Sequence, residues 1–168
     1  VEHQMRKLGV PRMSFSTIVL FGPRSAMAHG VPGKTHLKPG DQVLIDLGVV
    51  YNGYCSDITR TFAFKFATPE FKKMYDVTLA AQLAAVEACR PGSPIGAVDQ
   101  ASRAIIVSAG FGNHCGLRVG HGIGIEIHEY PSMTSDNGDL LLPGMTFTVE
   151  PGLSVGAAGG VRIEDDVL

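Results

Sequence analysis

The sequence predicts a mixed α/β (α+β) fold. Three observations favour this class: a hairpin-like stretch over residues 41–64, two helix-like segments over residues 69–109, and glycine-rich strand-like segments from residue 115 onward. The chain has 168 residues, of which 45% are hydrophobic, so it can bury one sizeable core. Its 21 glycines and 10 prolines imply many turns between short elements. We therefore expect residues 1–168 to form a single domain.

Residues 41–64, DQVLIDLGVVYNGYCSDITRTFAF, are predicted to form a β-hairpin. Val43–Val50 and Tyr54–Phe64 are rich in β-branched and aromatic residues. The dipeptide Asn52-Gly53 between them favours a tight two-residue turn. Because loop length and turn type set the register of a hairpin, this turn also predicts which residues of the two strands face each other.

Two aspartates fall on one face of this hairpin. In the register set by the turn, Asp46 lies opposite Thr59, and Asp57 is two residues from Thr59 on the same side. Neighbours on one face lie about 5–8 Å apart, which lets two carboxylates share one or two cations about 3.5–4 Å apart. The alternative is a turn cap for Asp46 and a solvated face for Asp57. Asp46 weakens that alternative, because it interrupts an apolar run where an uncompensated charge would cost several kcal/mol.

The region before the hairpin carries a short strand candidate, Phe15–Phe21, followed by a loop over residues 22–34 that is dense in glycine and proline. Residues 37–40 then make the turn into the first hairpin strand. His29 lies in the loop, where a histidine is more often a solvated surface group than a functional one. No Gly-x-Gly-x-x-Gly or Walker pattern follows a strand, so a nucleotide phosphate is not the expected ligand.

Two helices are predicted after the hairpin. The first spans residues 69–90, with Thr68 as its N-cap and Pro69 as its first residue. Its core-facing stripe is expected at helical spacing: Phe71, Met74, Tyr75, Thr78, Leu79, Gln82, Leu83 and Val86. The second helix spans residues 94–109 and repeats this start, with Ser93 as its cap. Both helices are interpreted as scaffold.

The segment CGLRVGHGIGIEIHEYP, residues 115–131, is strand-like, and glycines on either side of His121 let other groups approach its imidazole closely. A lone histidine on an apolar strand is more often a hydrogen-bonded core residue than a metal ligand. His128 follows seven residues later, an odd offset that in a regular strand would point the two side chains in opposite directions. The pattern favours His121 on a metal ion and His128 displaced toward a substrate.

Acidic residues also mark the later strands. A polar loop, residues 132–139, precedes a predicted strand at Met145–Glu150, and a final apolar run contains Glu164. Glu150 and Glu164 could each be surface residues, but a carboxylate in or at the end of an apolar run needs a partner. The candidate ligands are four carboxylates and one imidazole at strand positions: Asp46, Asp57, His121, Glu150 and Glu164. This oxygen-rich set suits a pair of Mn²⁺, Co²⁺, Fe²⁺ or Zn²⁺ ions.

Composition excludes several classes of protein. The formal net charge is −2 and the Lys and Arg residues form no basic stripe, so neither nucleic acid nor a membrane is the expected partner. No apolar run reaches the roughly 18 residues needed to cross a bilayer, and the N-terminus lacks the features of a signal peptide, so we expect a cytoplasmic protein. Cys55, Cys89 and Cys115 are odd in number and far apart, so no disulfide scaffold is expected.

Five motifs in order carry a resemblance to a known family. They are IDLG with Asp46, SDITRTF with Asp57, GHGIGIEIHE with His121 and His128, TVEPG with Glu150, and GGVRIEDDV with Glu164. The chain resembles the catalytic domain of the pita-bread metallopeptidases, which include methionine aminopeptidases, aminopeptidase P, prolidase and the creatinase-like hydrolases. The last two motifs resemble the aminopeptidase P and prolidase branch. The resemblance implies a curved antiparallel sheet with helices outside it, in two half-repeats related by a pseudo-twofold axis.

The resemblance also implies a dinuclear metal centre. In such a centre, Asp57 and Glu164 bridge both ions, Asp46 chelates one ion, and His121 and Glu150 bind the other. Two cations lower the pKa of a shared water toward neutrality and polarise the scissile carbonyl, so no Ser or Cys nucleophile is required. Mn²⁺ or Co²⁺ are the expected ions, with Zn²⁺ or Fe²⁺ as alternatives.

By the same resemblance, other side chains serve the substrate. Glu150 is expected to carry protons, His29 and His128 to hold or protonate the substrate, and Arg162 to support the carboxylates. The expected reaction is hydrolysis of a peptide bond near a peptide N-terminus or in a dipeptide, of the Xaa-Pro aminopeptidase or dipeptidase type. The expected partner is therefore a peptide or dipeptide, and a homodimer is retained as an option for assembly.

Two departures from the prolyl-specific pattern keep other functions open. Leu117 stands four residues before His121, where prolyl-specific members usually carry a histidine, and Ser154 stands where they tend to have tyrosine. One alternative is therefore a creatinase-like enzyme that hydrolyses a non-peptide amide or C–N bond, and another is a non-catalytic binding module with the same fold. The resemblance also implies that the chain is incomplete at both ends and lacks the usual N-terminal domain.

Overall fold

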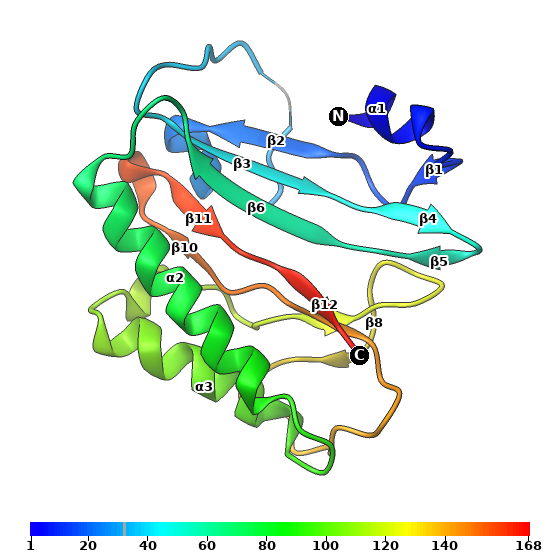
Figure 1. The fold of residues 1–168 in the computed structure, drawn as a ribbon. Coiled ribbons are helices and arrows are strands. Elements are labelled where there is room, and N and C mark those ends of the chain that lie inside the picture. Colours follow the sequence, from blue (N-terminus) through cyan, green and yellow to red (C-terminus); the bar gives the residue numbers. More distant parts are fainter. Residues whose placement is uncertain (32) are drawn as a thin grey trace.

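The computed structural model describes residues 1–31 and 33–168, so Pro32 of the expected loop over residues 22–34 lies outside the described residues. Figure 1 shows two groups of antiparallel strands next to each other, with the two long helices along the outside of the second group. The first group contains the hairpin and the N-terminal strands. The second contains the strands that follow the helices.

The predicted hairpin is present and its register is confirmed. It consists of β3 (Gln42–Leu47), β4 (Val49–Tyr51), β5 (Tyr54–Cys55) and β6 (Ile58–Ala63). Asp46 pairs with Thr59, as the turn predicted. Asn52 and Gly53 both have positive φ, as a tight hairpin turn of this kind requires.

Each hairpin strand is interrupted, which the sequence pattern did not predict. Gly48 separates β3 from β4, and Ser56 and Asp57 separate β5 from β6. A Cβ at Gly48 would lie 1.9 Å from the carbonyl oxygen of Ser56, so the two chains pass too closely for any side chain there. Asp57 therefore lies in a break between strands rather than within one continuous strand.

The N-terminal segment adds two strands to the hairpin. After a short helix, α1 (Glu2–Lys7), strand β1 (Arg12–Met13) pairs with β4. Strand β2 (Ile18–Phe21) pairs with β3, which places Ile18 opposite Asp46. The strand expected at Phe15–Phe21 thus begins three residues later than predicted, and a 3₁₀ turn, η1 (Gly22–Ala26), opens the loop after it.

Both predicted helices are present. In α2 (Pro69–Ala88), the Thr68 hydroxyl accepts a hydrogen bond from the Phe71 backbone N–H at 3.1 Å, the expected cap. Helix α3 (Ile95–Ser108) begins one residue later than predicted, because Pro94 rather than Ser93 occupies the N-cap. No helix in the described part of the chain is long and apolar enough to cross a membrane.

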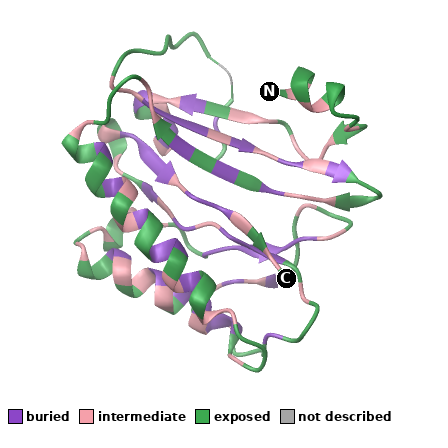
Figure 2. Ribbon diagram, viewed as in Figure 1, coloured by how far each residue is buried: buried purple, intermediate pink, exposed green. Residues whose placement is uncertain are grey.

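The buried face of α2 differs from the predicted stripe. Leu79, Leu83 and Val86 are exposed, whereas Ala81 and Ala85 are fully buried. Figure 2 shows the buried side of α2 turned toward α3 and the strands. Small alanine side chains allow these elements to approach closely, so the helix turns its alanines inward rather than its leucines.

The second strand group has the order β12-β9-β7-β8, with β10 and β11 as a separate pair. Its strands are β7 (His121–Gly122), β8 (Glu129–Ser132), β9 (Phe147–Val149), β10 (Gly152–Ser154), β11 (Gly160–Arg162) and β12 (Asp165–Val167). Residues 115–131 do not form one strand, contrary to expectation. The chain bends after Gly122, and β8 returns so closely that a Cβ at Gly122 would lie 2.1 Å from the Tyr130 carbonyl oxygen.

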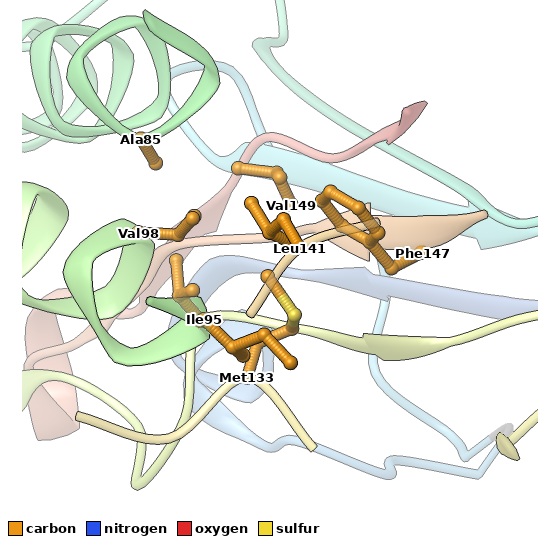
Figure 3. Packing of buried hydrophobic residues seen from close by; sticks show 8 residues of the cluster. Ala85, Ile95, Val98, Met133, Leu141, Phe147 and Val149 are labelled. Carbon is orange, nitrogen blue, oxygen red and sulfur yellow. The ribbon is translucent and has the colours of Figure 1, made fainter. Parts of the chain in front are cut away.

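The main core lies between the helices and this second group. Figure 3 shows the cluster, in which Ile95 and Val98 of α3 pack against Phe147 and Val149 of β9 and against Met133. Val98 and Val149 are completely buried. Close packing on this side of β9 holds rigidly the strand that leads directly to Glu150.

Candidate metal centre

The five residues predicted as metal ligands lie around one point where the two strand groups meet. Asp46 and Asp57 come from the hairpin, and His121, Glu150 and Glu164 come from the second group. His121 Nε2 lies 3.7 Å from Asp57 Oδ2 and 3.3 Å from Glu150 Oε1. Asp57, His121 and Glu164 each offer one ligand atom, and these atoms lie within 4.8 Å of one another. All five side chains line a single cleft of about 750 Å³.

Three carboxylate oxygens in this cleft are buried without a partner. Within the described residues, Asp46 Oδ1, Asp57 Oδ1 and Glu164 Oε1 accept no hydrogen bond. A buried anionic oxygen without a partner is strongly unfavourable. Divalent cations would supply the missing partner to all three, and carboxylate oxygens with one imidazole are suitable ligands for them. The residues of this centre therefore fit a metal site.

Three of the candidate ligands, Asp46, Glu164 and Asp57, are held in position by hydrogen bonds to other groups. The Arg162 guanidinium donates a hydrogen bond to Asp46 Oδ2, and the Thr59 hydroxyl donates one to Glu164 Oε2 at 2.5 Å. Asp57 is held through its backbone, since its N–H donates to Asp166 Oδ2 at 3.1 Å. In Asp46 and Glu164 these contacts hold one oxygen of each carboxylate, and the other oxygen has no partner among the described residues.

His121 presents a neutral imidazole to this centre. Its Nδ1 lies 3.0 Å from the Gly122 carbonyl oxygen, which can only accept, so Nδ1 carries the proton and Nε2 the lone pair. Burial lowers the pKa of His121 to about 4, despite the opposing effect of that hydrogen bond. Nε2 is therefore available as a ligand atom at neutral pH.

The acidic groups are shifted in the opposite direction. Burial, followed by the charges of Asp46 and Glu150, raises the pKa of Asp57 to about 8. Burial raises the pKa of Glu150, and burial with the charges of Glu150 and Asp57 raises that of Glu164 well above its usual range. Like charges this close cannot all ionise unless cations offset them. The electrostatics of the centre therefore also favour bound cations.

These shifts predict how the metal-free protein responds to pH. Above pH 6.5 the folded His121 is neutral and the unfolded one loses its remaining protons. Asp57, with its pKa near 8, keeps in the folded protein a proton that an unfolded aspartate has lost. The folded state then binds more protons, so its free energy of unfolding falls as pH rises from 6.5 to 8. We expect the melting temperature in chelator to decrease across this range.

The control for this prediction is Asp57→Asn, which removes one of the carboxyl groups with a raised pKa and should make the pH dependence shallower. A melting temperature that rises between pH 6.5 and 8 in the metal-free wild type would contradict the assignment. Below pH 6.5 the His121 shift acts in the opposite sense, because the unfolded imidazole binds a proton that the folded one rejects.

His29 and His128 both line the cleft. Both residues are largely exposed to solvent. The pKa of His128 is nevertheless lowered, first because neighbouring atoms partly shield the ring from water and then because of the charges of Arg118 and His29. In a regular strand, His128 would point away from His121, but in this structure it does not. Because the chain bends between β7 and β8, the two rings meet edge to face, 4.2 Å apart between centroids.

The two departures noted in the sequence lie in different places. Leu117 lines the cleft and is 94% exposed. Ser154 lies on β10 and lines a smaller cavity of about 160 Å³, which shares Glu150 and Arg162 with the cleft. Leu117 thus lies in the cleft that holds the five candidate ligands, whereas Ser154 lies in the neighbouring cavity.

Two residues that hold the centre were not selected from the sequence. The hairpin register indicates Thr59 only as the partner of Asp46, and no sequence signal indicates a role for Asp166. The strand alternation that puts Asp46 and Asp57 on one face of the hairpin also puts Thr59 on that face. This pattern could therefore have identified Thr59 as part of the site. Nothing local to Asp166 indicates a contact with Asp57, which is far away in the sequence.

A cleft lined by buried carboxylates at the junction of two strand groups is typical of a site that binds divalent cations. The model of metallopeptidase family M24 matches residues 1–168, and the chain belongs to this family. The family and the pita-bread fold class expected from the sequence are thereby confirmed.

Individual relatives agree with this assignment. The chain is 53% identical over 167 residues to the protein named "Putative dipeptidase YkvY" from Bacillus subtilis, covering 99% of this chain and 46% of the relative. Among solved structures, it is similar to an Xaa-Pro dipeptidase from Bacillus anthracis (44% identity, TM-score 0.96, 99% of this chain and 47% of that one). It is also similar to the prolidase from Pyrococcus furiosus (42% identity, TM-score 0.96, 99% and 50%). The chain thus spans about half the length of these relatives.

Proposed function

We propose that this chain carries the dinuclear metal centre of an Xaa-Pro aminopeptidase or dipeptidase, which hydrolyses a peptide bond near a peptide N-terminus or in a dipeptide. The observation that carries the proposal is the set of three buried carboxylate oxygens without partners, on Asp46, Asp57 and Glu164. Relatives named as dipeptidases and prolidases support the substrate class. Mn²⁺ or Co²⁺ are the proposed ions, with Zn²⁺ or Fe²⁺ as alternatives.

The proposed ligands divide into bridging and terminal groups. Asp57 and Glu164 would hold both ions, Asp46 one of them, and His121 with Glu150 the other. The ions supply a water of lowered pKa and a polarised scissile carbonyl. In this arrangement the protein itself has to orient the carboxylates, exclude excess water from the floor of the cleft and move protons.

Glu150 is the proposed proton carrier. Its side chain is 22% exposed, while those of Asp57 and His121 beside it are almost completely buried, so it can reach both the floor of the cleft and its opening. A raised pKa, caused mainly by burial, brings Glu150 nearer to the range in which a carboxylate can take and return a proton at neutral pH. His29 and His128, on the open side, are proposed to hold the substrate or protonate the leaving group.

The test is a metal-dependent hydrolysis screen on Xaa-Pro dipeptides, other dipeptides and longer peptides, using the whole protein that contains this chain. We expect cleavage that requires a divalent ion and includes Xaa-Pro substrates. Tight metal binding without cleavage of any peptide would instead favour a non-catalytic module. Comparing the rates on Xaa-Pro and other dipeptides also measures the preference for proline. Cleavage of any peptide in the screen would argue against the creatinase-like alternative, which acts on a non-peptide bond. A cytoplasmic location and a homodimer remain predictions.

A second enzyme function is favoured by Leu117, whose apolar side chain stands exposed in the cleft. An enzyme that hydrolyses a non-peptide amide or C–N bond would not need an imidazole there. If the protein is a peptidase, the missing polar contact should reduce discrimination, because rejection of a wrong substrate depends largely on buried polar groups left unpaired. We therefore predict only a mild preference for proline after the scissile bond.

Leu117→His should sharpen that preference. The measurement is the ratio of kcat/KM for Ala-Pro and Ala-Ala in the wild type and the variant. Leu83→His, on the exposed face of α2, is a control that adds an imidazole far from the cleft and should leave the ratio unchanged. A wild-type ratio above about a thousandfold, roughly 4 kcal/mol of discrimination, would contradict this interpretation of Leu117.

A further inference from the structure

Thr59 lies among the candidate ligand carboxylates. The sequence pattern did not reveal this position. Thr59 is completely buried on β6 and faces Asp46. Its hydroxyl accepts a hydrogen bond from Arg162 Nε–H at 3.1 Å and lies 2.5 Å from Glu164 Oε2. A guanidinium can only donate, so the single hydroxyl proton is free to go to Glu164. An ionised Glu164 can only accept, so the Thr59 hydroxyl donates to it while accepting from Arg162.

Arg162 extends the network to a second carboxylate, because its Nη2 donates to Asp46 Oδ2. One oxygen of Asp46 and one of Glu164 are thus held by donors, through a continuous path that runs Asp46–Arg162–Thr59–Glu164. The other oxygen of each carboxylate has no partner in the described residues. The network separates the two oxygens of each carboxylate into one that is held and one that is free.

We propose that Thr59 is a positioning residue for the metal centre, whose hydroxyl determines which oxygens of Glu164 and, through Arg162, of Asp46 are presented to the ions. The proposal rests on the proposed function, since it requires divalent ions at this centre. Ligand carboxylates are commonly oriented by hydrogen bonds from outside the site, and losing one typically weakens metal binding about 10–100-fold.

The same strand offers a matched control. Thr61 lies two residues further along β6, on the same face, and is 4% exposed. Its hydroxyl also joins β6 to β11, donating to the Arg162 carbonyl oxygen at 2.9 Å and accepting from the Arg162 N–H at 3.1 Å. Within the described residues, the hydrogen bonds of this hydroxyl go only to backbone atoms and to none of the carboxylates. Thr61→Val therefore removes an equivalent buried hydroxyl without releasing a proposed ligand.

The experiment measures Mn²⁺ affinity and stoichiometry by calorimetry for the wild type, Thr59→Val, Thr59→Ser and Thr61→Val, each prepared metal-free. Thr59→Val should bind Mn²⁺ about 10–100-fold more weakly. Thr59→Ser, which restores the hydroxyl, and Thr61→Val should bind like the wild type. The melting temperature of each metal-free variant shows separately what the substitution does to stability. If Thr59→Val does not fold, Thr59→Ala and Thr61→Ala take the place of the valine pair.

The outcomes separate this proposal from the function on which it rests. Wild-type affinity in Thr59→Val, or an equal loss in Thr59→Val and Thr61→Val, would overturn the role of Thr59 while leaving the metal centre intact. Weakened binding in Thr59→Ser would do the same, because the hydroxyl would then not be the group that matters. An absence of Mn²⁺ binding by the wild type would instead refute the proposed function.

Discussion

Removal of divalent metal should abolish hydrolysis by this protein and lower its melting temperature. The cations are expected to bind only the folded arrangement, so they add to its free energy of unfolding by mass action. One site at a metal concentration a hundredfold above its Kd contributes about 2.7 kcal/mol, or roughly 5–10 °C for a domain of this size. Without metal, the buried carboxylates around Asp57 also face one another uncompensated.

The measurement is a thermal melt and a peptide hydrolysis assay before and after exhaustive chelation. Mn²⁺ or Co²⁺ should restore both properties, whereas Mg²⁺ at the same concentration serves as a comparison for non-specific salt effects. Asp57→Asn should show a smaller loss on chelation than the wild type, because one proposed bridging ligand is already weakened. An unchanged melting temperature and unchanged activity after chelation would rule out the metal centre.

Glu150→Gln should lower kcat at least about a hundredfold, the usual scale for loss of a positioned acid–base group. Glutamine keeps the shape of the side chain and one oxygen that can face the centre, but it cannot accept a proton. In the wild type, Glu150 Oε1 lies 3.3 Å from His121 Nε2, and the Thr148 hydroxyl lies 3.3 Å from the same oxygen. These contacts should keep the substituted side chain in place.

Metal content must be measured alongside turnover, since Glu150 is proposed both as a ligand and as a proton carrier. A hundredfold loss in a variant that still binds two ions would assign the loss to proton transfer. Glu87→Gln, an exposed position on α2 that pairs with Arg90, is the control and should retain activity. Near-normal turnover of Glu150→Gln with full metal content would show that another residue acts as the general base.

The hairpin could be predicted almost completely from the sequence. Asn52-Gly53 permits a tight turn, and a two-residue turn leaves one register, so the pairing of Asp46 with Thr59 followed from local chemistry. The breaks at Gly48 and Asp57 could not be predicted in this way. They depend on how closely the two chains pass, which a pattern of β-branched residues does not report.

In the helices, too, the local features could be predicted from the sequence and the packing could not. Thr68 capped α2 as expected, because an N-cap is an interaction within one turn of chain. The buried face of α2 was predicted wrongly at Leu79, Leu83 and Val86, because the choice between leucine and alanine at a contact depends on the distance to the neighbouring elements. That distance is a property of the packed protein.

The sequence by itself determined the chemical types and the candidates for the site. An acidic residue inside an apolar run, as at Asp46 and Glu164, indicates a buried carboxylate that needs a partner. This inference requires only the sequence. Only the tertiary structure decided how these groups meet: that the His128 ring meets the His121 ring edge to face, that Asp166 accepts a hydrogen bond from the Asp57 N–H, and that Thr59 lies between Arg162 and Glu164. The three hydrogen bonds join residues more than a hundred positions apart, and the geometry of all these contacts depends on the packing of whole strands rather than on any local preference.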